Sequence, residues 1–156
     1  MTIRDKVWFD TAWLSPGKES RFLTMGDRIG QLDLTNMVIV GQFSGKGSDI
    51  RSIGVRLPGR SKAEEDALLD HMLVYFSIND KRCWESPAAV CSTKEYRGLD
   101  DIEPAPEKAL PGYVFEKTLH VPERAYVHAE IYATRKLPIA TEAQVLFFCR
   151  QKVDVV

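Results

Sequence analysis

The chain has 156 residues, of which 44% are hydrophobic and 28% are charged, with 21 basic residues against 22 acidic ones. This length and composition suit one globular domain, which would bury about two-thirds of the surface of the unfolded chain. The formal net charge of -1 and the absence of long runs of like charge argue against non-specific nucleic-acid binding, which depends on basic patches. We therefore expect a single domain over residues 1–156 and no nucleic acid among its partners.

The N-terminal segment MTIRDKVWFDTAW is charged and has no apolar core of the kind that a secretory signal needs. No apolar run approaches the roughly 18 residues that suggest a membrane-spanning helix, so we expect no membrane partner. Cys83, Cys91 and Cys149 form an odd and sparse set, which predicts reduced thiols in a cytosolic setting.

Short strand-like runs separated by turn residues dominate the sequence. Within residues 50–57, for example, Ile53, Val55 and Leu57 alternate with polar or small residues, which is the period of two expected for a strand. The polar segment 79–82 predicts a tight turn. Strands are predicted at 6–14, 21–25, 37–43, 50–57, 72–80, 113–121, 125–137 and 143–156.

Residues 36–49, NMVIVGQFSGKGSD, look at first like a phosphate-binding loop, because a β-branched run leads into a glycine-rich turn. A P-loop needs four residues between its glycines, a Ser or Thr directly after the lysine, and a following helix. Here only three residues separate Gly41 from Gly45, Lys46 is followed by Gly47, and the sequence continues as a strand. The stretch therefore predicts a hairpin turn between antiparallel strands.

One helix is predicted over residues 61–72. Ser61 with Glu64 three residues later is a capping-box pattern, and acidic residues in the first turn suit the positive end of the helix dipole. Residues 92–112 follow a different pattern, with many charges and three prolines at Pro104, Pro106 and Pro111. We interpret them as a long surface loop, because no second core follows them.

The clearest strand is 125–137, where apolar and polar residues alternate. Tyrosine is enriched at interfaces, so the polar side is a candidate face for a sugar or protein partner, while cross-strand packing explains it as well. The apolar side consists of Val127, Ala129, Ile131 and Ala133. The candidate face consists of Tyr126, His128, Glu130 and Tyr132.

Eight or nine short strands with one helix predict a mainly β fold, an antiparallel β-sandwich or barrel. A doubly wound α/β fold is disfavoured because strands and helices do not alternate. Among sandwiches, the jelly roll suits eight strands with long connections. Trp8, Trp13 and Trp84 are expected in the core.

No pattern in the sequence brings catalytic groups together. HxH, HExxH, CxxC and GxSxG motifs are missing, and His120 and His128 would approach each other only if their strands paired in a favourable register. The acidic residues at 64–66 and at Asp100 and Asp101 fit a helix N-terminus and a solvated loop. We therefore expect no catalytic residue, no metal and no cofactor, and a protein that is not an enzyme.

The segment LVYFSINDKRCWESPAAV, the proline-bearing loop and FEKTLHVPERAYVHAEIYATRKL together resemble single-jelly-roll virion proteins of the phage capsid decoration (cementing) type. The resemblance covers residues 70–156 and rests on strand–turn–strand order. It implies a structural virion protein, made in the host cytoplasm, that forms homo-oligomers, with a trimer favoured. Its partner would be a major capsid or other virion protein, contacted through residues 1–14 and 92–112.

Two other functions stay open. A carbohydrate- or protein-binding β-sandwich module would use the face from Tyr126 to Tyr132, stay monomeric and change its tryptophan fluorescence with ligand. A cupin-like barrel enzyme would assemble its site from distant residues and carry stoichiometric metal on purification.

Overall fold

The computed structural model describes residues 2–16, 20–24, 29–31, 34–93 and 110–153. In these ranges the chain forms eight strands, one α-helix and one short 3-10 helix. In chain order they are β1 (Thr2–Leu14), β2 (Ser20–Thr24), β3 (Gly47–Arg56), α1 (Lys62–Leu69), β4 (Met72–Ile78), β5 (Lys81–Pro87), η1 (Ala88–Cys91), β6 (Tyr113–Pro122), β7 (Val127–Ala133) and β8 (Thr141–Val153).

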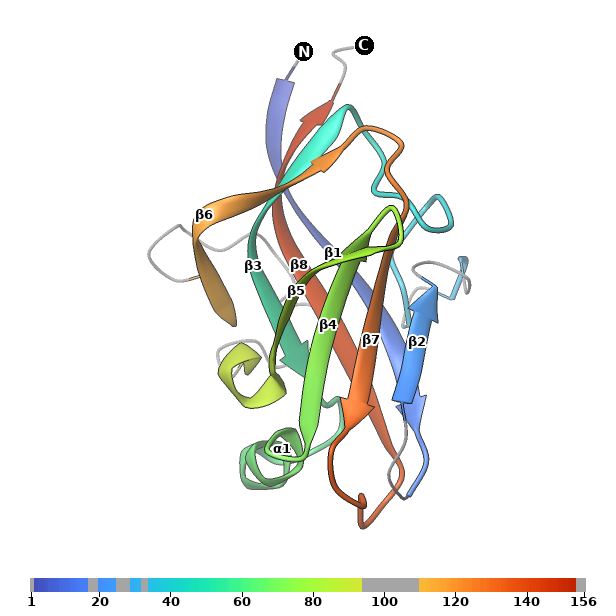
Figure 1. Cartoon of the computed structure of the whole chain (residues 1–156), viewed down its shortest axis with the longest axis vertical. Helices are drawn as coiled ribbons and strands as arrows, with labels where there is room; N and C mark the ends of the chain where they lie inside the picture. The colour runs from blue at the N-terminus through green and yellow to red at the C-terminus, as the bar shows by residue number, and fades with distance from the viewer. Residues whose placement is uncertain (1, 17–19, 25–28, 32–33, 94–109, 154–156) are drawn as a thin grey trace.

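The strands pair from the outside of the sequence inward. β1 pairs with β8, β2 with β7, β3 with β6 and β4 with β5, all antiparallel, so the chain is one long hairpin of four nested strand pairs. Pairing of β8 with β3 and of β7 with β4 rolls this hairpin into two sheets, ordered β1-β8-β3-β6 and β2-β7-β4-β5. The two packed sheets are visible in Figure 1. This arrangement is a jelly roll, and it confirms the predicted antiparallel β-sandwich.

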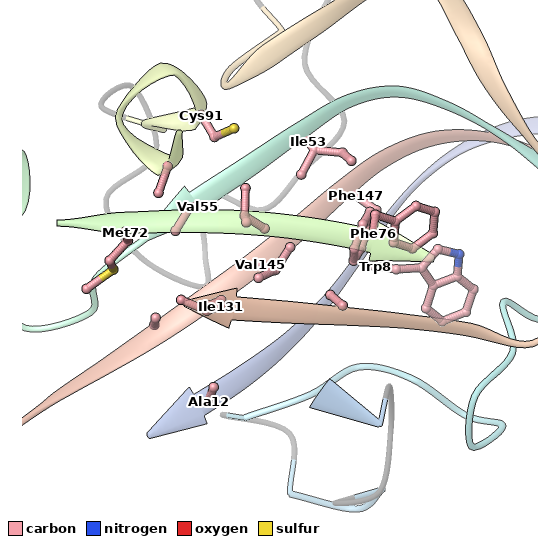
Figure 2. Packing of buried hydrophobic residues seen from close by; sticks show 14 of the residues in the cluster. Trp8, Ala12, Ile53, Val55, Met72, Phe76, Cys91, Ile131, Val145 and Phe147 are labelled. Carbon is pink, nitrogen blue, oxygen red and sulfur yellow. The ribbon is translucent and has the colours of Figure 1, made fainter. Parts of the chain in front are cut away.

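Apolar side chains from both sheets fill the space between them. Phe147 of β8 lies between Phe43 and Phe76, with ring centroids 5.5 Å and 4.9 Å away, and Trp8 stacks on Phe43 at 5.9 Å. Figure 2 shows Trp8, Phe76 and Phe147 gathered in one part of this core. The alternation predicted for the strand at 125–137 is confirmed, because its four apolar residues are all buried here.

The outer face of the β1-β8-β3-β6 sheet is apolar too. Val7, Phe9, Leu146 and Phe148 form a second buried cluster there, with Leu110 packed against it. β8 is therefore buried on both faces, which explains its unbroken apolar run VLFF. The alternation predicted for residues 50–57 does not appear as a difference in exposure, because the polar and small residues of that strand are buried as well.

The predicted helix and the predicted tight turn are both present, although the bounds of the helix differ. Ser61 caps α1: its Oγ accepts from Glu64 N at 3.2 Å, and Glu64 Oε1 accepts from Ser61 N at 3.3 Å. The helix ends at Leu69, earlier than predicted, because Met72 already belongs to β4. Asn79 and Asp80 join β4 to β5 with φ of 51° and 63°, the two-residue turn that matches strand twist.

The strand predicted at 37–43 is wrong. These residues form a short turn closed by an isolated bridge between Ile39 and Gln42, and Gly41 has a left-handed φ of 73°. Gly45 and Gly47 also have positive φ, so the backbone departs from the extended conformation just before β3 and at its first residue. Of the predicted hairpin over 36–49, residues 36–46 therefore belong to a glycine-rich connection between β2 and β3, and residues 47–49 begin β3.

Most of the loop predicted at 92–112 lies outside the described residues. Its two ends lie on β3: Ser92 bridges Val55, and a Cβ on Gly112 would overlap the backbone of Ile53 and Gly54.

Candidate functional site

Tyr126, His128, Glu130 and Tyr132 lie on the outer side of the β2-β7-β4-β5 sheet, opposite the buried apolar residues of β7. Their exposure is uneven. Tyr126 is 36% exposed, Glu130 and Tyr132 are half-buried, and His128 is buried at 7%. The four residues are therefore not one open aromatic strip. Whether they bind a ligand stays a prediction.

Cross-strand neighbours extend this face with polar groups that the sequence did not indicate. Tyr75 of β4 lies opposite Glu130 on one side and Glu85 of β5 on the other. The guanidinium of Arg82 lies 3.9 Å from the centroid of the Tyr75 ring and 3.7 Å from the Glu130 carboxylate. This cation–π contact and ion pair make a polar, hydrogen-bonding face beside Tyr132.

Tyr126 also belongs to a second region, the end of the sandwich where β4 meets β5 and β6 meets β7. Asn79 N donates to Tyr126 O at 2.7 Å, and Tyr126 N donates to Asn79 Oδ1 at 2.9 Å. Val127 N donates to Gly41 O at 2.7 Å, and the Tyr126 ring covers Gly41 so closely that a Cβ there would overlap it. Three connections that are far apart in sequence are thus fixed to one another.

The connections at this end carry four exposed apolar residues, which we call the apolar tip: Val38, Ile39, Val40 and Tyr126. Their exposed fractions are 61%, 44%, 48% and 36%. The sequence did not predict the tip, because Val38, Ile39 and Val40 are three consecutive β-branched residues and such a run predicts a strand. The signal that could have found it is the density of glycines at 41, 45 and 47, which favours turns.

The three connections at this end also carry charged residues of both signs. Lys46 Nζ lies 3.5 Å from Glu123 Oε1, and Asp80 Oδ1 lies 3.9 Å from His128 Nδ1. Arg124 is exposed and has a left-handed φ of 66°, which only glycine adopts without cost. The connections at this end therefore carry charges of both signs.

A third aromatic group closes one side of the sandwich. Trp84 of β5 contacts Tyr113 and Phe115 of β6, each at 5.6 Å between ring centroids, and the two β6 rings are 5.4 Å apart. The contacts tie the edge strands of the two sheets together.

Of the three tryptophans expected in the core, Trp8 is buried and Trp84 is half-buried against it, but Trp13 is 48% exposed.

Potential catalytic groups stay apart. His120 lies on β6 and His128 on β7, in different sheets, and His120 Nδ1 instead lies 2.7 Å from Asp49 Oδ1. Across the described residues, no group of three or more His, Cys, Asp or Glu side chains is placed to hold a metal ion. No helix in the described part of the chain is long and apolar enough to cross a membrane.

The three thiols are free, and burial sets their chemistry. Burial raises the pKa of the Cys91 thiol to about 12, against the opposing effect of a hydrogen bond with Ser86. Burial, and then the nearby Asp49 carboxylate, raise the pKa of Cys149. Cys83 is the exposed thiol of the three, and partial desolvation raises its pKa as well. A thiol with a raised pKa is a weak nucleophile at neutral pH.

A scan against protein-family models finds no match for this chain, and searches of curated proteins and of solved structures find none either.

Proposed function

We propose that this protein is a structural component of a virus particle, a capsid decoration protein that binds a major capsid or other virion protein and associates with copies of itself. The observation that supports the proposal is the strand order, β1-β8-β3-β6 packed on β2-β7-β4-β5. Jelly rolls with this two-sheet arrangement recur in viral capsid proteins, and also in lectins and cupins. Since a fold alone does not define a function, the surface has to separate these classes.

The exposed apolar residues of the apolar tip support assembly with another protein. The centre of a protein interface is apolar, and Val38, Ile39 and Val40 expose apolar side chains to solvent. The mechanism would be burial of apolar area between rigid surfaces, with no chemical step. A trimer is what the resemblance to decoration proteins implies, and the particle is where the protein would be found after synthesis in the host cytoplasm.

The proposal is tested on purified virus particles from the source that carries this gene. Quantitative mass spectrometry should find peptides of this chain in a fixed ratio to the major capsid protein after density-gradient purification. A wash with a low concentration of urea, which weakens apolar contacts, should then release this protein while the shell stays intact. Particles that contain no trace of the chain would refute the proposal.

A carbohydrate- or protein-binding module is the second candidate, favoured by the polar face around Tyr75, Arg82, Glu130 and Tyr132. Glycan-array binding that is lost in Glu130→Gln and Tyr132→Ala, but kept in the exposed-site control Val90→Ala, would support it. A wild-type protein that binds no glycan and no protein through this face would exclude it.

A further inference from the structure

We infer that the outer edge of β1 at residues 2–6 is the site where an extended, acidic segment of the partner protein adds as a further strand. The inference rests on the proposed binding to a virion protein and names how that partner is held. In the part of the chain that the structure describes, β1 is an edge strand with β8 on one side only. It pairs with β8 over 13 residues without a register shift, so the edge is long and regular. Such an edge pairs with another strand unless something blocks it.

Asn36 blocks one half of this edge. Its side-chain amide accepts from Phe9 N at 2.8 Å and donates to Val7 O at 2.6 Å, as a peptide group of a neighbouring strand would. Asn36 N also donates to Phe9 O at 3.4 Å, and Thr35 Oγ1 donates to the same oxygen at 3.1 Å. These bonds show that the backbone groups of odd-numbered β1 residues point away from β8.

The other half of the edge is open among the described residues. Because the ladder with β8 is unbroken, the alternation that turns the backbone groups of Phe9 outward also turns those of Ile3 and Asp5 outward. Residues 2–5 are exposed, and β8 holds their other side. A rigid edge with outward N–H and C=O groups is the surface that strand addition uses.

Charge selects the strand that fits this edge. Two copies that both use Ile3 and Asp5 would set Ile3 opposite Asp5, and so would set Arg4 directly opposite Arg4 of the second copy. Like charges in directly opposite positions destabilise a strand pair. Arg4 Nε donates to the neutral amide of Gln151 at 3.1 Å, which does not neutralise the guanidinium. The occupant is therefore a segment of another protein, with an acidic residue opposite Arg4, and not a second copy.

The first test uses the full chain, isotope-labelled for NMR, and two peptides: acetyl-Thr-Val-Glu-Val-Thr-amide and the same peptide with Lys in place of Glu. At millimolar concentration the Glu peptide should shift the amide resonances of Ile3 and Asp5 and slow their hydrogen exchange. It should bind about fivefold more tightly than the Lys peptide, because only Glu attracts Arg4. Equal binding of the two peptides overturns the acidic partner, and no shift with either peptide overturns strand addition.

The second test separates backbone pairing from side-chain contact. Ile3→Pro removes one outward N–H and keeps the bonds to β8, because an edge strand tolerates proline where the N–H faces away from the sheet. Ile3→Ala is the matched control, since it removes the same side chain and keeps the N–H. With the Asp5 amide as the reporter, Ile3→Pro should weaken binding of the Glu peptide about tenfold and Ile3→Ala at most about threefold. Equal weakening in two variants that both fold overturns the inference.

Failure of this inference and failure of the proposed function are distinguishable. If neither peptide binds but purified particles contain the protein, the virion proposal stands and strand addition at β1 is wrong. If the Glu peptide binds as expected but the particles lack the protein, only the virion proposal fails.

Discussion

The ring of Tyr126 lies against Gly41 so closely that a Cβ on residue 41 would overlap the ring. Gly41 also has a φ of 73°, where an L-residue is strained. We expect Gly41→Ala to lower the free energy of unfolding by about 2–4 kcal/mol, from the left-handed conformation and the overlap together. Urea denaturation measures the change. Gly59→Ala is the matched control, because Gly59 has a φ of 78° with nothing within 4 Å, so it should lose only the conformational part.

At Arg124 we expect a substitution to raise the stability of the protein, whereas Gly41→Ala lowers it. Its left-handed φ of 66° costs a non-glycine residue about 1–2 kcal/mol, so Arg124→Gly should raise the melting temperature. Arg124→Ala keeps the strained backbone and should give no such gain. A gain of equal size in both variants would mean that the arginine side chain, and not the backbone, is the source of the cost.

Trp8 and Trp13 lie on the same strand, β1, but differ in burial, so their substitutions show how much stability depends on burial. Trp8 is 1% exposed and stacks on Phe43, while Trp13 is 48% exposed. We expect Trp8→Ala to cost about 3–5 kcal/mol, since it leaves a cavity in the core, and Trp13→Ala to cost about 0.5 kcal/mol or less. Chemical denaturation of the two variants gives the comparison, and similar losses would contradict the assigned core.

The buried Cys91 thiol predicts a loss of stability in alkali. Its pKa is raised to about 12 by burial, while the unfolded chain ionises the same thiol near pH 9. Its contribution to stability is therefore complete below about pH 9 and is lost as the pH rises toward about 12, by up to about 1.4 kcal/mol per pH unit. Cys91→Ala should show a shallower fall between neutral pH and about pH 10 in urea denaturation. Parallel curves for the two proteins would show that this thiol does not titrate in that range.

The sequence predicted those features that depend on local pattern. The alternation around Ile131 indicated one buried face, and the Ser61 capping box marked the start of α1. The features it missed depend on which distant segment covers which surface. Residues 37–43 have strand-like side chains, but Gly41 must pass beneath Tyr126, and the pattern of residues 37–43 alone does not contain that contact. His128 is polar in a period-two pattern, yet it is buried.

The nesting of the four strand pairs favours folding from the innermost pair outward. The turn at Asn79–Asp80 closes the innermost pair with two residues, whereas Thr2 must find Val153 across almost the whole chain. Loop-closure entropy rises and folding slows as contacts become more distant in sequence. On the ribosome, β1 is made well before β8, its strand partner. Until β8 has emerged, Val7, Trp8 and Phe9 lack the strand that they pack with, so they are exposed to premature aggregation.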